Sequence, residues 1–183
     1  MSVREASAQG LACARAALAG NPSDGYGGAV LAVTVPPLRA EATVRLLEDH
    51  AATRRAPIAS CTIDPPSELV EATVRRFVRT FAPGAAAAAV RWRTSVPRGV
   101  GLGGSSAIVI STLRALCELH GVGLAPEELA SFALEVETEE LGIAAGLQDR
   151  VAQAHGGLTF MEFGGDRRYE PLPPDLLAPL LIA

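Results

Sequence analysis

Lysine is absent from this chain of 183 residues, and all sixteen of its basic side chains are arginine. A Walker A phosphate loop is therefore excluded, because the lysine of its GK(S/T) segment cannot be supplied. Schiff-base chemistry on a lysine amine is excluded for the same reason. The net charge of −4 argues against a nucleic-acid partner, since such partners usually need a clustered basic face.

Cysteine and long apolar runs are also scarce. Cys13, Cys61 and Cys117 are odd in number, widely spaced and outside any CxxC pair, which predicts inert buried thiols rather than disulfides or metal ligands. No run of about 18 uncharged apolar residues occurs, so no membrane-spanning helix is expected. The N-terminal MSVREASAQG lacks the basic start and apolar core of a signal peptide, and we expect a cytoplasmic protein with no membrane partner.

The spacing of apolar residues predicts the main elements. Strands are expected at Ala29–Val35, Glu41–Leu47, Ala87–Thr94 and Gly157–Phe163. Helices are expected at Ser67–Phe81, Ser105–His120 and Pro126–Leu141. The apolar segment Leu180–Ala183 is typical of a strand that is just beginning. Strands first and helices later, without strict alternation, favour an α+β fold.

The segment Val96–Thr112, VPRGVGLGGSSAIVIST, places a cluster of glycines and two serines directly before an apolar helical pattern. A helix N-terminus carries unpaired N–H groups and about half a positive charge. Glycine lets the backbone come close to an anion and adopt a positive φ angle. Two interpretations stay open on this pattern alone. It is either an ordinary glycine turn, or a phosphate loop in which Ser105 and Ser106 add hydroxyl ligands for phosphate or Mg²⁺.

Pro97–Ala107, PRGVGLGGSSA, resembles the second motif of the GHMP kinases, the family of galactokinase, homoserine kinase, mevalonate kinase and phosphomevalonate kinase. In that family the motif is the ATP phosphate loop, and it lacks lysine, as it does here. The doubled glycine before the serines is most similar to the plant glucuronokinase branch. The resemblance implies ATP binding by Pro97, Gly99, Gly101, Leu102, Gly103, Gly104, Ser105, Ser106 and Ala107.

A second similarity lies at Arg15–Tyr26, RAALAGNPSDGY. It resembles the first motif of galactokinase-like members, whose acidic residues hold sugar hydroxyls. Asn21 and Pro22 replace the Glu-His pair of that motif, and the string GNPSD is instead similar to glucuronokinase. Asn-Pro-Ser-Asp-Gly is also a favourable turn sequence, which is the competing interpretation. The resemblance implies substrate-binding roles for Arg15, Asn21, Ser23, Asp24 and Tyr26.

The third segment, Glu137–Asp149, is ETEELGIAAGLQD. On a helical wheel Glu137 falls on the buried side, where an unpaired carboxylate is costly, so it needs a partner such as Mg²⁺. Glu140 also falls on or beside that side but can reach solvent at the helix end. The carboxylates that point away and are expected to be solvated are Glu128, Glu135 and Glu139.

The separations of Glu137, Gly142 and Asp149 are those of the galactokinase pattern. The resemblance implies that Asp149 is the catalytic base and that Ser106 and Glu137 bind Mg²⁺. A helix N-cap is the competing interpretation of Asp149. Trp92, alone on a strand pattern, is interpreted as a packing residue.

Together the three motifs imply a ribosomal-protein-S5-domain-2-like α+β fold, with residues 1–178 as the N-terminal ATP-binding domain of a GHMP kinase. Residues 179–183 are expected to begin a C-terminal domain whose glycine-rich motif is not found in this chain. The implied reaction is ATP- and Mg²⁺-dependent phosphorylation of a sugar, at the anomeric hydroxyl of a uronic acid such as glucuronate. The alternatives are another acceptor, such as mevalonate or phosphomevalonate, and an inactive nucleotide- or sugar-binding module. We expect self-association or a complementing C-terminal domain, because the family's second half is missing.

Overall fold

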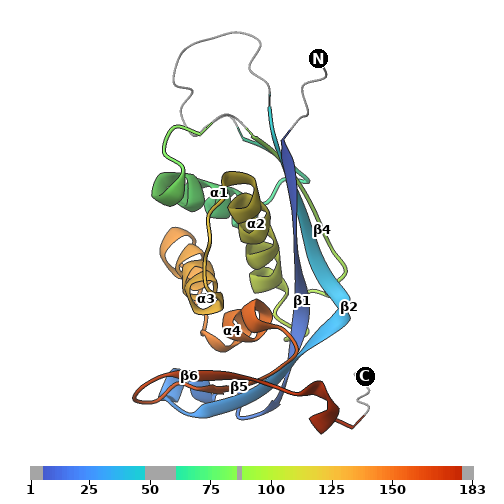
Figure 1. Cartoon of the computed structure of the whole chain (residues 1–183), viewed down its shortest axis with the longest axis vertical. Coiled ribbons are helices and arrows are strands. Elements are labelled where there is room, and N and C mark those ends of the chain that lie inside the picture. The colour runs from blue at the N-terminus through green and yellow to red at the C-terminus, as the bar shows by residue number, and fades with distance from the viewer. Residues whose placement is uncertain (1–5, 48–60, 86–87, 179–183) are drawn as a thin grey trace.

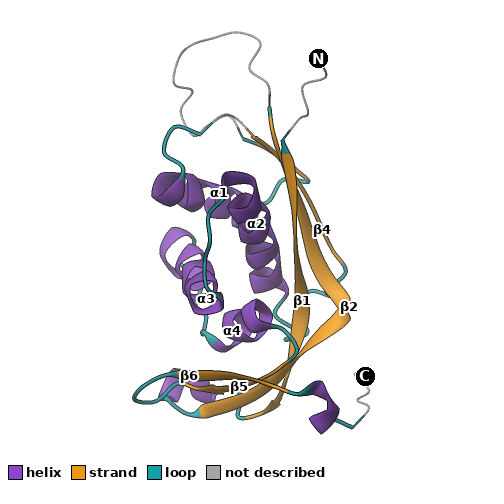
Figure 2. Cartoon of the chain, in the orientation of Figure 1, coloured by secondary structure: helices purple, strands orange, loops and turns teal. Residues whose placement is uncertain are grey.

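The computed structural model describes residues 6–47, 61–85 and 88–178. Four α-helices lie on one face of a mixed, six-stranded sheet (Figures 1 and 2), so the expected α+β fold is confirmed. The strand expected at Leu180–Ala183 and the domain start at residues 179–183 lie outside the described residues. Among the residues described, no helix is both long and apolar enough to cross a membrane.

The sheet is organised around one long strand, β2 (Ala29–Leu46). Along one edge β2 pairs with β1 (Ser7–Ala19). Along the other edge its first half pairs with β5 (Leu158–Glu162), which pairs with β6 (Arg168–Leu172). Its second half pairs with β4 (Ala88–Thr94), and β4 pairs in parallel with β3 (Thr62–Asp64).

The prediction of two separate strands, Ala29–Val35 and Glu41–Leu47, was therefore wrong. Both belong to β2, and the residues between them lie where the register with β1 shifts, between Cys13 and Ala14. Two prolines, Pro36 and Pro37, fall in this interval. Proline cannot donate to the hydrogen-bond ladder and is tolerated at such irregularities. The bend of β2 at this point is visible in Figure 1.

The helix α1 (Glu68–Phe81) confirms the element expected at Ser67–Phe81. The Ser67 hydroxyl caps it by accepting a hydrogen bond from the Val70 N–H at 3.4 Å, which satisfies one of the unpaired donors of the first turn. The apolar stripe faces the core, where Val70, Val74 and Phe77 are buried.

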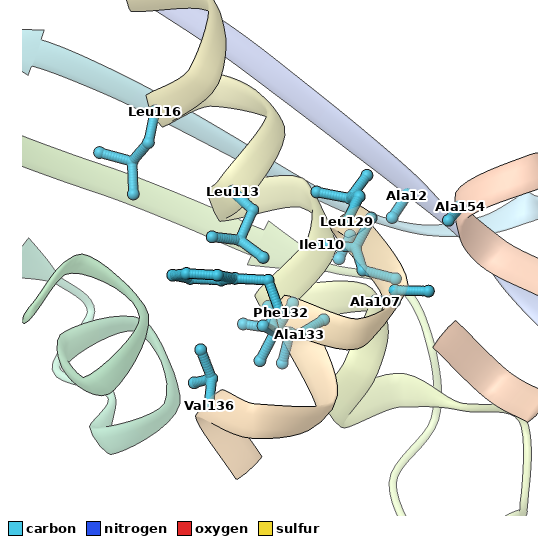
Figure 3. Packing of buried hydrophobic residues seen from close by; sticks show 14 of the residues in the cluster. Ala12, Ala107, Ile110, Leu113, Leu116, Leu129, Phe132, Ala133, Val136 and Ala154 are labelled. Atoms are coloured by element: carbon cyan, nitrogen blue, oxygen red, sulfur yellow. The ribbon is translucent and has the colours of Figure 1, made fainter. Parts of the chain in front are cut away.

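The second helix, α2 (Gly104–His120), is the centre of the core. Its residues Ile110, Leu113 and Leu116 pack between the sheet and Phe132 of α3 (Pro126–Glu135; Figure 3). The helix approaches β1 closely at Gly10, where an added Cβ would collide with the carbonyl oxygen of Ser111. This packing places the start of α2, and the glycine loop before it, beside β1.

The helix expected at Pro126–Leu141 ends earlier than predicted. α3 spans Pro126–Glu135, and a π-helical turn follows at Val136–Glu140. This turn faces the arginines of α1. Glu135 and Glu139 are 43% and 61% exposed, in agreement with the expectation that they are solvated, but both also form ion pairs. Arg76 donates to Glu139 at 2.8 Å and also pairs with Glu135.

The last helix, α4 (Gln148–His155), was not expected from the sequence, and neither were β1 and β6. α4 packs against α3 and lies near the start of α2 (Figure 1). The Arg114 guanidinium of α2 links it to β1, donating to the Leu11 carbonyl oxygen at 2.6 Å and to the Ala154 carbonyl oxygen at 2.9 Å. The element that carries Asp149 is thus fixed to α2 and β1.

Candidate active site

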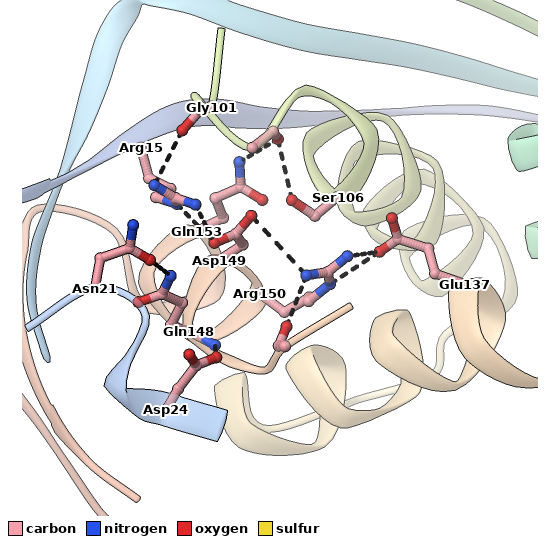
Figure 4. Close-up of polar contacts among 12 residues, drawn as sticks. Arg15, Asn21, Asp24, Gly101, Ser106, Glu137, Gln148, Asp149, Arg150 and Gln153 are labelled. Carbon is pink, nitrogen blue, oxygen red and sulfur yellow. Dashed lines mark hydrogen bonds and ion pairs between the residues drawn. The ribbon is translucent and has the colours of Figure 1, made fainter. Parts of the chain in front are cut away.

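Three parts of the chain that are far apart in the sequence meet at the start of α2 (Figure 4). β1 supplies Arg15, and the turn after it supplies Asn21 and Asp24. The glycine loop leads into α2, and α4 supplies Asp149 in its first turn. The backbone N–H of Arg15 donates to the Leu102 carbonyl oxygen at 3.0 Å, which holds the loop along β1.

The glycine loop has the backbone geometry of an anion cradle. Gly99, Gly101 and Gly103 all have positive φ angles, of 73°, 73° and 69°. Gly103 is the N-cap of α2, and no side chain caps this helix. The Gly103 carbonyl oxygen is itself fixed by the Gln153 amide, at 2.8 Å, and by the Ser106 hydroxyl, at 3.0 Å. The N–H groups of the first turn of α2 are therefore presented without a competing side-chain acceptor.

A cavity of about 650 Å³ opens over this loop. Its wall runs from the loop to Trp92 and Ser67, and also includes Arg15 and Asp149. Trp92 is half-buried and its indole N–H donates to the Pro65 carbonyl oxygen at 2.8 Å. Trp92 thus packs, as expected, but it also lines the cavity. The volume is within the usual range for small-molecule sites.

Asp149 is held by Arg15. The Arg15 Nε donates to Asp149 Oδ1 at 2.7 Å, and Nη2 bonds the same oxygen. The remaining Arg15 nitrogen, Nη1, donates to the Gly101 carbonyl oxygen at 3.1 Å. The N-cap of α4 is Leu147, so Asp149 does not occupy the cap position of the competing interpretation. One guanidinium therefore connects the candidate base to the glycine loop.

A second, smaller cavity of about 300 Å³ lies on the other side of Asp149. Asp24, Glu137, Gln148 and Arg150 contribute to its wall. Three residues line both cavities: Arg15, Ser105 and Asp149. The two cavities thus meet at Asp149, the carboxylate whose spacing from Glu137 and Gly142 made it the candidate base.

Glu137 is fully buried, as the helical wheel predicted, but it already has a protein partner. Arg150, which is 4% exposed, donates from Nε to Glu137 Oε2 at 2.8 Å and pairs through Nη2 with the same oxygen. Arg150 also donates to the Gly146 carbonyl oxygen at 2.7 Å, and its Nη1 lies 3.9 Å from Asp149 Oδ2. The other Glu137 oxygen, Oε1, is buried without a hydrogen-bond partner.

A Mg²⁺ ion fits this donor set in part. Glu137 Oε1 is a hard, unpartnered oxygen in the wall of the smaller cavity, and the Ser106 hydroxyl donates to Gly103, which leaves its lone pairs to accept. In the described part of the chain no cluster of three or more His, Cys, Asp or Glu side chains forms a metal site. Mg²⁺ commonly takes only one or two protein oxygens and completes its shell with phosphate and water.

The residues predicted from the first motif separate into two groups. Arg15, Asn21 and Asp24 lie at the site, where the Asp24 Oδ2 accepts from the Gln148 N–H at 3.3 Å and Asn21 bonds the Gln148 amide. Ser23 instead stabilises its own turn, bonding the carbonyl oxygens of Gly20 and Ala29. Tyr26 is 90% exposed and lines neither cavity.

Sequence reasoning missed three side chains of the site. They are Gln148, Arg150 and Gln153, all buried. Their only sequence signal is position, because they flank Asp149 in the string GLQDRVAQ.

Comparison with known proteins finds similarity to one family over about half of the chain. The family model of the GHMP kinases N terminal domain matches residues 68–157. D-glycero-alpha-D-manno-heptose 7-phosphate kinase of Campylobacter jejuni is 36% identical over 101 residues, which is 55% of this chain and 30% of that kinase. Glucuronokinase 1 of Arabidopsis thaliana is 43% identical over 96 residues, or 48% of this chain and 26% of that enzyme. The matched segment is therefore under a third of either relative.

Solved structures agree on the fold. The crystal structure of a D-glycero-D-manno-heptose 1-phosphate kinase from Bacteroides thetaiotaomicron superposes with a TM-score of 0.77 at 26% identity, covering 90% of this chain and 60% of that one. Galactokinase from Lactococcus lactis, solved with galactose, gives a TM-score of 0.75 at 15% identity, covering 91% of this chain and 47% of that one. The second likeness concerns the fold alone.

Proposed function

Because the chain carries the N-terminal domain of the GHMP kinases, we propose that it supplies the ATP-binding part of a sugar kinase. In this proposal residues 1–178 form that domain, and residues 179–183 begin a second one. The observation that carries the proposal is the meeting of the two cavities at Arg15, Ser105 and Asp149. A phosphoryl donor in the larger cavity and an acceptor in the smaller one would face each other across this point. Phosphoryl transfer depends mostly on such positioning.

The larger cavity is the donor site. The phosphates of ATP lie on the glycine loop, where the first-turn N–H groups of α2 and the Ser105 hydroxyl donate to phosphate oxygens. The apolar part of the wall, with Trp92, receives the base. Glu137 and Ser106 hold Mg²⁺, which when bound neutralises charge on the transferred group.

The smaller cavity is the acceptor site, and Asp149 is the base. Arg15 occupies Oδ1 of the carboxylate and leaves Oδ2 to accept a proton. The acceptor hydroxyl gives its proton to Asp149 while its oxygen attacks the γ-phosphorus, and the bond from that phosphorus to the leaving ADP oxygen breaks. The fixed carboxylate orients the hydroxyl as well as accepting its proton.

The acceptor we favour is a sugar, phosphorylated at the anomeric hydroxyl of a uronic acid such as glucuronate. The likeness to glucuronokinase supports the uronic acid, and the likeness to two heptose phosphate kinases supports sugars in general. The polar wall formed by Asp24, Gln148 and Arg150 suits a ligand rich in hydroxyl groups. Mevalonate kinase of Pyrococcus horikoshii also matches, at 35% identity over 80 residues, which keeps mevalonate as the alternative acceptor.

The test has two parts. Titration of the 183-residue chain with Mg·ATP should show binding, and Mg²⁺ should strengthen it. An active protein that contains this chain should then release ADP in the presence of glucuronate, and not with mevalonate, in a panel that also holds galactose and heptose phosphates. ADP release with mevalonate alone would replace the sugar by the alternative acceptor. ATP binding without ADP release from any acceptor would indicate an inactive binding module.

A further inference from the structure

Gln148 is a buried side chain of the smaller cavity to which the proposed reaction assigns no step. It is 7% exposed, begins α4, and directly precedes Asp149. Its Nε2 donates to the Asn21 side-chain oxygen, and its backbone N–H donates to Asp24 Oδ2 at 3.3 Å. Gln148 therefore fastens the turn after β1 to the helix that carries the candidate base (Figure 4).

The contact between turn and helix is close. A Cβ added at Gly146 would lie closer than van der Waals contact to Asp24 Oδ2, so glycine at residue 146 leaves room for the Asp24 carboxylate against the segment before α4. Asp24 and Gln148 thus form one wall of the smaller cavity, and Asn21 supports this wall from behind by accepting a hydrogen bond from the Gln148 amide.

The Gln148 side chain has one unused hydrogen-bonding atom. Its Oε1 is buried and has no partner, and a buried amide oxygen without a donor is costly. In a cavity wall, such an oxygen is placed to accept a hydrogen bond from a ligand, because no group in the described part of the free protein donates to it. A ligand hydroxyl supplies that donor, whereas a carboxylate or phosphate does not.

We propose that Gln148 is a specificity-determining residue that accepts a hydrogen bond from the acceptor hydroxyl adjacent to the one that is phosphorylated. This inference rests on the proposed sugar kinase activity and narrows its acceptor class. The cavity of about 300 Å³ is small enough that a ligand whose reacting hydroxyl lies at Asp149 also touches Gln148. The site therefore selects acceptors with two hydroxyls on neighbouring carbons, as in sugars. Mevalonate, whose reacting carbon has no hydroxyl on its neighbour, lacks this group.

The experiment compares D-glucuronate, 2-deoxy-D-glucuronate and mevalonate as ligands of the 183-residue chain, with Mg²⁺ and a non-hydrolysable ATP analogue present. We expect the 2-deoxy sugar to bind about 10-fold more weakly than glucuronate, the usual effect of one buried hydrogen bond of this kind. Gln148→Leu, which keeps the approximate size of the side chain but removes the amide, should abolish this difference.

Two further variants separate recognition from folding. Gln148→Glu keeps the acceptor oxygen and should keep the preference for the 2-hydroxyl group. Gln153→Leu makes the same substitution at the other buried glutamine of α4, which bonds Gly103 in the glycine loop. It should weaken binding of the ATP analogue while leaving the ratio between the two sugars unchanged.

The results distinguish failure of the role proposed for Gln148 from failure of the proposed kinase activity. A preference for glucuronate that survives Gln148→Leu, or equal binding of the two sugars by the unaltered chain, overturns the role of Gln148 and leaves the kinase proposal standing. Absence of sugar binding in a chain that binds the ATP analogue also overturns it. The kinase proposal itself fails separately, when no acceptor stimulates ADP release in an active protein that contains this chain.

Discussion

Arg15 and Asp149 stand 134 positions apart in the sequence, yet two nitrogens of one guanidinium donate to a single oxygen of one carboxylate. The third nitrogen of Arg15 bonds the Gly101 carbonyl oxygen. A lysine could not replace this fork, because its single ammonium group lacks the planar arrangement of donors. The pair fixes Asp149 relative to the glycine loop before any ligand is present.

The first prediction concerns Asp149→Asn, which keeps the shape of the side chain and removes its charge. In an active protein that contains this chain, we expect kcat to fall by about 10²–10⁴-fold, the usual contribution of general-base catalysis. The ATP dissociation constant of the chain should change little. Steady-state kinetics and ATP titration measure the two quantities. Asp64→Asn, at an exposed carboxylate paired with Arg91, is the control, and near-normal kcat in Asp149→Asn would remove Asp149 from the chemistry.

A second prediction compares two glycines of the loop that share a positive φ angle. At Gly101 an added Cβ meets nothing within 4 Å, whereas at Gly103 it lies 2.9 Å from Gln153 Nε2. Gly101→Ala should lose about 1–2 kcal/mol of stability from backbone strain alone. Gly103→Ala should lose more and should also weaken ATP binding, because it displaces the side chain that fixes the loop. Thermal unfolding and ATP titration provide the comparison, and equal effects of the two substitutions would contradict the role of Gln153.

The sequence predicted the elements whose pattern is local. α1 could be predicted because its apolar stripe and arginine face repeat at helical spacing. β1 was missed because SAQGLACARAALA is rich in alanine, a good helix former, and becomes a strand only through pairing with β2. α4 was missed because it has only eight residues and follows a glycine-containing loop.

The same distinction holds for the site. The glycine loop, Glu137 and Asp149 stood out by composition and spacing. The partners of both carboxylates did not, because Arg15 is remote in sequence from Asp149, and Arg150 has no pattern that connects it to Glu137. The buried position of Glu137 was predictable from the helical wheel, but the identity of its protein partner depends on how α4 docks against the π-helical turn.

The third prediction concerns this Glu137–Arg150 pair, which is almost fully buried. Arg150→Met leaves the Glu137 carboxylate without its partner and should cost about 3–5 kcal/mol of folding stability. The double variant Glu137→Met/Arg150→Met should recover much of that loss, since neither charge is then buried. Denaturant unfolding of the two single variants and the double variant measures the coupling. Additive effects would show that the pair does not interact energetically.

The fourth prediction uses pH to test the contact between α1 and the π-helical turn. Glu140 pairs with Arg75, Arg76 and Arg79, and these arginines, Arg79 first, lower the pKa of its carboxyl below the ordinary value of 4.5. A carboxyl whose pKa is lower in the folded chain stabilises the fold above the unfolded value, and this stabilisation is lost as pH falls through the folded value. The ion pairs of Glu140 therefore stabilise the fold at neutral pH, and this stabilisation is lost in acid.

Glu140→Gln should accordingly lower Tm by about 2–4 °C at neutral pH, the shift that about 1 kcal/mol produces in a chain of this size. We expect no larger effect, because solvent screens the arginines. The Tm difference from the unaltered chain should begin to shrink as pH falls below about 4.5, where Glu140 becomes protonated in the unfolded chain, and should vanish only below the lower pKa of this carboxyl in the folded chain. Glu139→Gln is the matched control, because Glu139 is 61% exposed and pairs only with Arg76 among the described residues, so its effect should be smaller at every pH. A Tm difference for Glu140→Gln that stays constant from neutral to acidic pH would show that packing, and not the ion pairs, accounts for the loss.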